Sequence, residues 1–142
     1  MTIAAILGGK GRTLVSVTAD QSVREAVALL AGRRIGAVPV MDGAQVVGIF
    51  SERDVIHGLK ANGAAALDAK VGDVMTAPAI TVTPTHAVIG ALSLMTRRRI
   101  RHLPVVEDGQ VVGIVSIGDL VKYRIDRIEA DAEAMRSYIQ QA

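Results

Sequence analysis

The sequence has no cysteine and no tryptophan, and its 142 residues include only two tyrosines and one phenylalanine. Without cysteine the chain can form no disulfide framework and no thiolate nucleophile or metal ligand. Aromatic residues make up 2% of the chain and the net charge is +2, so both the stacking surface and the strong positive charge used in nucleic-acid binding are missing. A nucleic-acid interaction would rest only on the arginines within residues 97–101.

Long apolar runs are also missing. Charged residues interrupt every apolar stretch well before the ~18 residues that a membrane-spanning helix requires. The N-terminal residues show no basic lead-in followed by a long apolar region, so no secretory signal is visible. We therefore expect a soluble, cytoplasmic protein that forms one compact unit with a sizeable core, since a chain near this length buries roughly 70% of its unfolded surface.

Signatures of catalysis are scarce as well. The histidines His57, His86 and His102 stand in no metal-ligand spacing, and neither GxSxG nor HExxH occurs. The segment GGKGRT lacks the spacing of a phosphate-binding P-loop, and no strand is predicted before it. We therefore expect neither an enzyme nor a metal site.

What the sequence does contain is a tandem repeat. The segment 35–54, IGAVPVMDGAQVVGIFSERD, returns at 100–119 as IRHLPVVEDGQVVGIVSIGD, without a gap and at a constant offset of 65 residues. The same offset relates Val17 to Val82 and Val23 to Val88. Two copies are too few for a solenoid, so the repeat favours a closed pair of units related by a pseudo-twofold axis.

Each copy is predicted to fold in the order strand, helix, strand, strand, helix, which makes the chain an α+β protein. In the first copy we expect strands at 14–18, 38–41 and 46–50, the last two joined across an Asp42-Gly43 turn. In the second copy we expect strands at 80–83, 103–106 and 111–115. A short helix over 2–7 is expected to end at Gly8 and Gly9.

These elements divide the chain into a first domain at 8–62, a connector at 63–74, a second domain at 75–124 and a helical extension at 125–142. The last helix is predicted to begin at Ser116 and to continue to about Gln140. Apolar residues recur along it in alternating steps of four and three, a heptad pattern; they are Val121, Ile125, Ile128, Ala132, Met135 and Ile139. Packing against its own domain and pairing across a dimer explain this stripe equally well.

A serine followed three residues later by an aspartate stands at the same place in both copies, directly between a strand and a helix. The pairs are Ser51 with Asp54 and Ser116 with Asp119. Each pair could simply cap its helix, because the serine satisfies a backbone N–H and the acid suits the first turn. A strand-to-helix turn also offers free N–H groups to a phosphate, and its acid could accept from the hydroxyls of a ribose. The duplication of the pair favours ligand binding.

Basic residues supply the other half of a phosphate site. Arg98 and Arg99 recur in the first copy as Arg33 and Arg34, whereas Arg101 and His102 are replaced there by Gly36 and Ala37. A helix C-terminus also favours cations, so some of these arginines could be plain solvated residues. Two clefts built from these copies are expected to differ in charge.

These motifs together resemble the CBS-domain family, in the form of a tandem pair (a Bateman module) like those of small stand-alone bacterial proteins. The segments that carry the resemblance are VSVTADQSVREAV, RRIGAVPVMDGAQVVGIFSERDV, VGDVMTAPAITVTPTHAV and MTRRRIRHLPVVEDGQVVGIVSIGDL. The resemblance implies two βαββα repeats packed as a pseudo-twofold module. It also implies two adenosine-nucleotide clefts and a homodimer.

Carried over to this chain, the resemblance implies that Asp54 and Asp119 bind ribose in the two clefts, with Ser51 and Ser116 near the phosphates. Val15 and Ile80 would line the adenine pockets. Arg101 and His102 would contact phosphate, and Gly36 and Ala37 would border the other cleft. The remaining ligand-binding candidates are Lys10, before the first strand, and the residues between each serine and its aspartate, namely Glu52, Arg53, Ile117 and Gly118.

The implied function is a sensor that binds AMP, ADP, ATP or NAD and signals to an effector protein through a change in shape or in dimer arrangement. The basic residues favour a phosphate-bearing ligand over S-adenosylmethionine. The alternative is an interaction or dimerisation scaffold whose nucleotide sites are vestigial. The sequence does not choose among the nucleotides.

Overall fold

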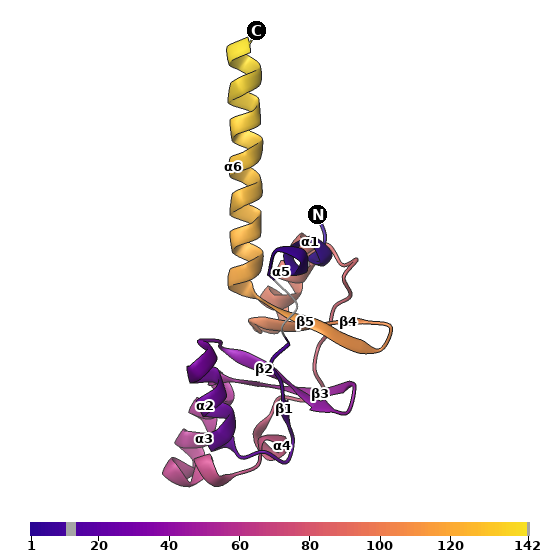
Figure 1. Ribbon diagram of the computed structural model, residues 1–142. Coiled ribbons are helices and arrows are strands. Elements are labelled where there is room, and N and C mark those ends of the chain that lie inside the picture. Colours follow the sequence, from indigo (N-terminus) through magenta and orange to yellow (C-terminus); the bar gives the residue numbers. More distant parts are fainter. Residues whose placement is uncertain (11–13, 142) are drawn as a thin grey trace.

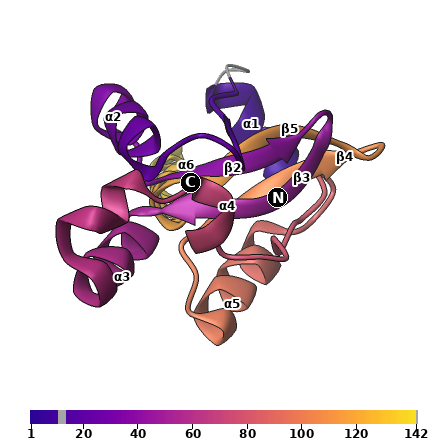
Figure 2. The same cartoon turned by 90° about the horizontal axis from the view of Figure 1, so that it is seen from below.

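The computed structural model describes residues 1–10 and 14–141, except for the side chain of Lys10. Two β-hairpins lie one over the other in the middle of the molecule, helices surround them, and the last helix projects away from this body (Figures 1 and 2). In chain order the elements are α1 (Ile3–Lys10), β1 (Val17–Thr18), α2 (Val23–Arg33), β2 (Ala37–Asp42), β3 (Gln45–Ser51), α3 (Glu52–Asn62), the 3-10 helix η1 (Gly63–Asp68), α4 (Val71–Val74), α5 (Val88–Arg98), β4 (His102–Glu107), β5 (Gln110–Ser116) and α6 (Ile117–Gln141).

The predicted duplication is confirmed in the strand pairing. In the first half, β1 runs parallel to β2, and β2 pairs antiparallel with β3. In the second half, β4 and β5 form the same hairpin, in which Val105 faces Gly113 as Val40 faces Gly48 in the first half. The fold is the expected mixed architecture of two β-sheets with helices, and α6 ends close to the predicted residue.

The first strand of each copy is shorter than predicted. β1 pairs over two residues, with Val17 opposite Val40, and the second copy keeps only the single bridge between Val82 and Val105. In the second copy the reason lies in the path of the chain, because Thr76 pairs with Ile49 of the first sheet. Within the next few residues the chain crosses to the second sheet, where Val82 pairs with Val105. It therefore pairs with each sheet over too few residues to form a longer strand.

The hairpin turn of the first copy also differs from the prediction. Both hairpins have two-residue loops at equivalent positions, closed by Asp42 opposite Gln45 and by Glu107 opposite Gln110. The loop of the second copy is Asp108-Gly109, as its Asp-Gly signal indicates, with φ of 52° and 77°. In the first copy the Asp-Gly pair stands one residue earlier, so Gly43 (φ 60°) takes the first loop position and Ala44 the second.

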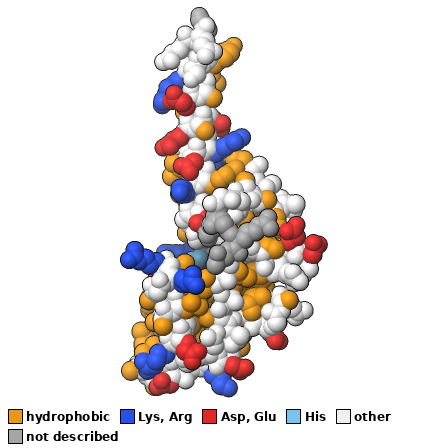
Figure 3. All heavy atoms as spheres, viewed as in Figure 1, with side chains coloured by type: hydrophobic (Ala, Val, Ile, Leu, Met, Phe, Trp, Pro, Cys, Tyr) orange, Lys and Arg blue, Asp and Glu red, His pale blue; other side chains and the backbone are white. Residues whose placement is uncertain are grey.

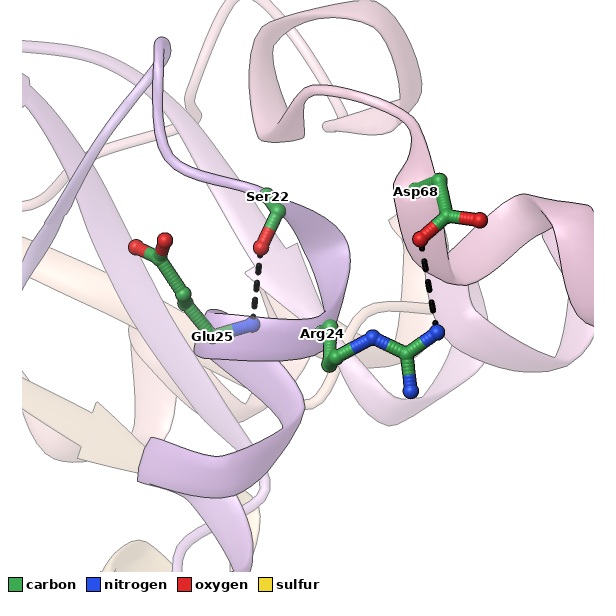
Figure 4. A network of polar contacts seen from close by, with 4 residues as sticks. All are labelled: Ser22, Arg24, Glu25 and Asp68. Carbon is green, nitrogen blue, oxygen red and sulfur yellow. Dashed lines mark hydrogen bonds and ion pairs between the residues drawn. The ribbon is translucent and has the colours of Figure 1, made fainter.

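Helix α2 shows how local signals place these elements. Ser22 caps the helix by accepting a hydrogen bond from the Glu25 backbone N–H at 3.1 Å. Arg24, two residues after Ser22, reaches Asp68 of η1 at 3.3 Å (Figure 4). Both side chains of that ion pair are more than half exposed, so it adds little stability. The buried face of α2, formed by Val23, Ala26 and Leu30, holds the helix on its sheet.

Each copy has a hydrophobic core of its own, and each core is completed by a helix from the other part of the chain. Val71 of α4 is fully buried in the first core, although the sequence predicts its segment as connector. Ile3 and Ile6 of α1 are buried in the second core, where the Ile3 N–H donates to the His86 carbonyl oxygen at 2.9 Å. Ile6 and Val71 are equivalent positions at the repeat offset of 65, so the exchange is reciprocal.

Helix α1 runs through the glycines that were expected to end it. It continues past Gly8 and Gly9 to Lys10, although each glycine costs roughly 1 kcal/mol relative to alanine in a helix. The buried side chains of Ile3 and Ile6 hold the helix against the second core and outweigh this weak propensity. None of the described helices combines the length and the apolar character needed to cross a bilayer.

Equivalent glycines in the two hairpins give a matched test of this packing. A Cβ at Gly48 would lie 2.9 Å from the Thr76 carbonyl oxygen, which is fixed in the bridge to Ile49. A Cβ at Gly113 would lie 2.7 Å from Leu7 Cδ2, which can rotate away. We expect Gly48→Ala to lower the free energy of unfolding by about 1–3 kcal/mol and Gly113→Ala by less than about 1 kcal/mol in urea titrations. Equal losses would contradict this account of how Thr76 packs on β3.

Candidate functional site

A cavity of about 280 Å³ lies between the two halves of the molecule. Both copies and the chain segment between them contribute to its wall. The lining residues are Gly36, Ile49, Ser51, Glu52, Arg53, Thr76, Pro78, Ala79, Ile80, Arg98, Arg99, Ile100, Arg101 and His102. Seven of the predicted site residues are therefore brought together, namely Gly36, Ser51, Glu52, Arg53, Ile80, Arg101 and His102.

Equivalent regions of the two copies form opposite sides of this cavity. In each region, here called the corner of the copy, the helix after the hairpin begins beside the start of the hairpin's first strand. In the first copy the Glu52 N–H, at the start of α3, donates to the Gly36 carbonyl oxygen at 3.0 Å. In the second copy the equivalent bond joins the Ile117 N–H to the Arg101 carbonyl oxygen at 2.8 Å. The start of each helix is thereby fixed beside the start of the first strand of its hairpin, which is β2 in the first copy and β4 in the second.

Gly36 and His102 face each other across the junction of the two copies. A Cβ at Gly36 would lie 3.3 Å from the His102 ring and 2.7 Å from Glu52 Oε1, so only glycine leaves this space open. The expectation that Gly36 borders a different cleft from Arg101 and His102 is therefore wrong. The two hairpins stack with these corners together, which the repeat offset could not reveal. Ala37 was expected beside Gly36, but it is 3% exposed and lies outside the lining.

The segment between the copies forms an apolar side of the cavity. Thr76 is held to β3 by two backbone bonds with Ile49, each 2.9 Å long. Pro78, Ala79 and Ile80 follow it along the wall. Ile80 is one of the predicted site residues, whereas Thr76, Pro78 and Ala79 were missed. The first copy has Gly11 and Thr13 where the second has Thr76 and Pro78, so comparing the copies gave no signal.

Asp54 lies behind the lining of the cavity. Its Oδ2 accepts from the Ser51 backbone N–H at 2.9 Å and from the Ser51 hydroxyl at 3.3 Å. Its Oδ1 accepts from the Thr76 hydroxyl at 3.0 Å. Ser51 and Thr76 both line the cavity, so the Asp54 carboxylate is one hydrogen bond away from it. It also ties the turn before α3 to the segment between the copies.

The second Ser-Asp pair forms a reciprocal cap at the start of α6. The Ser116 N–H donates to Asp119 Oδ2 at 2.8 Å, and the Asp119 N–H donates to Ser116 Oγ at 3.1 Å. The capping interpretation is therefore correct for this pair, and in the first pair Asp54 makes the equivalent bond to the Ser51 N–H.

Positive charge dominates the polar part of the cavity wall. Its four arginines are opposed by one carboxylate, that of Glu52, which leaves a formal charge of +3 with His102 neutral. Arg53 Nη1 donates to the Arg99 carbonyl oxygen at 2.8 Å and so links the two copies directly. Arg99 ends α5 with φ of 55°, as Arg34 ends α2 with φ of 54°. This arrangement suits a ligand with anionic oxygens.

The other predicted site residues do not reach this cavity. They are Val15, Ser116, Ile117, Gly118 and Asp119, none of which lines it. Residues 11–13 and the side chain of Lys10 lie outside the described residues, so the prediction for Lys10 stays a prediction. Within residues 1–10 and 14–141, no three histidine, aspartate or glutamate side chains come together in a way that could hold a metal ion.

The comparisons with known proteins agree with this architecture. The family model described as CBS domain matches residues 11–61 and 71–126. The CBS domain-containing protein CBSX3 of Arabidopsis thaliana, which is named as mitochondrial, is 36% identical over 98% of this chain and 72% of its own length. The CBS domain-containing protein YhcV of Bacillus subtilis is 31% identical over 75% of this chain and 76% of its own length.

Solved structures show the same fold. The CBS-domain containing protein ATU1752 from Agrobacterium tumefaciens superposes with a TM-score of 0.84 at 39% identity, over 87% of this chain and 99% of its own. The protein PAE2072 from Pyrobaculum aerophilum, solved in complex with AMP, gives a TM-score of 0.75 at 29% identity, over 84% of this chain and 89% of its own. The chain thus belongs to the CBS-domain family, as a tandem pair of CBS domains that forms a regulatory module.

Proposed function

We propose that the chain is a sensor of a phosphate-bearing adenosine nucleotide, with the cavity between the two CBS domains as its binding site. The observation that carries this proposal is the composition of the wall, where an apolar side formed by the interdomain segment stands together with four arginines and a histidine. A nucleotide has the same division into an apolar base and an anionic phosphate.

Each part of the nucleotide has a counterpart in the wall. The base is held between aliphatic side chains, chiefly those of Ile49, Ile80 and Ile100, because the described cavity wall contains no phenylalanine, tyrosine or tryptophan for stacking. The ribose hydroxyls bond near Ser51, where the Asp54 carboxylate is within reach if it exchanges the Thr76 hydroxyl for a ribose hydroxyl. The phosphates take charge-assisted hydrogen bonds from the arginines and His102.

Two further observations support this class of ligand. The relative from Pyrobaculum aerophilum was solved with AMP and is 29% identical to this chain. The formal charge of +3 on the wall opposes a cationic sulfonium, which favours AMP, ADP, ATP or NAD over S-adenosylmethionine. The residues around Asp119 and Val15 are retained in this proposal as a second, weaker cleft.

Signalling follows from the position of the cavity between the domains. A ligand shifts a conformational equilibrium only if it binds two states with different affinity. Phosphate bound by Arg53 competes with the Arg99 carbonyl oxygen for the same guanidinium, so binding alters a direct link between the domains. An effector protein or a second copy of the chain then reads the changed spacing. The cytoplasmic location stays a prediction.

A scaffold without a functional nucleotide site is the second candidate. It is favoured by the projecting helix α6, whose apolar residues are exposed beyond the body of the protein. Removing the residues after about Lys122 separates the two functions, because a scaffold would lose its interactions while a sensor would keep its nucleotide affinity.

Titration calorimetry of the nucleotide-stripped protein tests the proposal. We expect saturable binding of at least one of AMP, ATP and NAD, and weaker binding of S-adenosylmethionine, because the wall is basic. Heat release and a rise in melting temperature should accompany each other. If none of the four ligands releases heat or raises the melting temperature, the sensor function is wrong and the scaffold takes its place.

Arg101 and His102 can be replaced by the residues that stand at the equivalent positions of the first copy, Gly36 and Ala37. We expect Arg101→Gly combined with His102→Ala to raise the dissociation constant of the nucleotide at least about tenfold, since the lost charge-assisted bonds contribute roughly 1.5–3 kcal/mol each. The matched control is Arg97→Ala. It removes an exposed arginine in the last turn of α5, and this arginine does not line the cavity. Equal weakening by both variants would indicate only long-range attraction.

Substituting the two equivalent aspartates one at a time distinguishes a capping role from a role in ligand binding. Asp54→Ala and Asp119→Ala each remove a helix cap, and each should lower the free energy of unfolding by about 1 kcal/mol. Only Asp54 is bonded to residues of the cavity wall, so only Asp54→Ala should also weaken binding there. The NMR signals of the His102 ring report occupancy of this cavity alone. Unchanged affinity in Asp54→Ala would restrict Asp54 to capping.

A further inference from the structure

Helix α6 carries its apolar heptad stripe on a surface that the rest of the chain does not cover. Exposure along the stripe rises from 42% at Val121 through 53% at Ile128 to 65% at Ile139. Figure 1 shows α6 extending far beyond the body, and Figure 3 shows both hydrophobic and charged side chains on its surface. Packing against its own domain therefore does not explain the stripe.

The second domain contacts α6 on a different face of the helix from the apolar stripe. Leu120 is fully buried in the second core, and Tyr123 packs against the same core. With 3.6 residues per turn, Leu120 and Tyr123 point away from the line joining Val121, Ile125 and Ile128. Even at its base, the helix thus presents the stripe outward, with Val121 and Ile125 accessible to another molecule.

The stripe fits the core of a coiled coil. Ile125, Ala132 and Ile139 occupy the a positions of successive heptads, and Val121, Ile128 and Met135 occupy the d positions. The apolar stripe continues almost to the end of the described helix, so about five turns of helix need a partner. Most helical stability in proteins comes from packing of an apolar face, and beyond its base α6 has no such packing within the described chain.

Flanking charges select the partner and its direction. Arg124 and Asp131 lie at g positions, and Glu129 and Arg136 lie at e positions. In a parallel pair in register, a g residue faces the e residue five positions further along the other helix. Arg124 then meets Glu129, and Asp131 meets Arg136, so every charged g residue has an opposite charge. Arg136 also contacts Glu133 of its own helix at 3.1 Å, a highly exposed pair that holds it only weakly.

An antiparallel pair with the same overlap has the opposite electrostatics. In that arrangement e faces e and g faces g, which brings Glu129 of one helix to Glu129 of the other. Asp131 likewise meets Asp131, and Lys122 meets Arg136. These like-charge contacts oppose the antiparallel arrangement, so the charge pattern is complementary to a second α6 running in the same direction.

We propose that α6 is a dimerisation element that forms a parallel, in-register, two-stranded coiled coil with α6 of a second copy of this chain. The two bodies then lie at the same end of the coil. This pairing does not depend on nucleotide binding in the cavity.

Because the chain has no natural cysteine, a single introduced thiol tests the direction of pairing. Ile139→Cys places a thiol at an a position near the tip, where two copies in a parallel coil approach closely enough for a disulfide. Ser137→Cys is the matched control, two residues away and on the opposite side of the helix. Under mild oxidation of the full chain, we expect a covalent dimer from Ile139→Cys and little from Ser137→Cys.

Two outcomes of that experiment overturn the proposal. Equal cross-linking of both variants would indicate random collision. Cross-linking of Ile139→Cys only when it is mixed with Val121→Cys would indicate antiparallel helices.

Sedimentation of the unmodified thiol-free chain tests the pairing itself. Ile128→Asp, in the centre of the stripe, should raise the dimer dissociation constant at least about tenfold, while Ala130→Asp, on the opposite side, should leave it nearly unchanged. Glu129→Lys should weaken the dimer, and adding Arg124→Glu should restore it, because the Arg124–Glu129 contacts are then inverted. A monomeric natural chain, an assembly of three or more copies, or a dimer unaffected by Ile128→Asp would overturn the proposal.

Discussion

The reciprocal exchange of short helices between the two cores is the constraint on which the rest of the structure depends. Ile6 of α1 is buried in the second core and Val71 of α4 in the first, although each stands just ahead of the other domain in the chain. Neither core is complete without a segment from outside its own repeat. The two domains are therefore held side by side, and the cavity between them is a product of this packing.

The same constraint sets the composition of the cavity wall. After α4, the chain must return from the first core to the second sheet, and Thr76 to Ile80 make this crossing. The crossing lays an apolar segment beside β3, while the stacked corners bring Gly36 to His102. The second copy contributes Arg101 and His102 to the wall, whereas at the first of the equivalent positions the first copy has Gly36, which leaves room beside the His102 ring. The difference between the two copies at these positions is therefore found within one cavity.

Local signals predicted most of the fold. The repeat, the hairpins and the final helix follow from alternating apolar residues, turn residues and caps, which act over a few neighbouring positions. The spatial meeting of the copies could not be predicted in this way, because a repeat offset states which residues are alike and not which ones touch. The repeated Ser-Asp pair and the basic residues pointed to Ser51 and His102, and the family resemblance pointed to Ile80. Thr76 and the contact of Gly36 with His102 emerged only in three dimensions.

Helix α6 begins at the capped turn of Ser116 and Asp119 and continues without a described break through 25 residues. Its base is locked into the second domain by Leu120, so the helix cannot reorient without that domain. A helix of this length spans about 37 Å, and a tilt of about 5° at its base moves its end by about 3 Å. By this geometry alone, any rotation of the second domain would displace the far end of α6 more than its base.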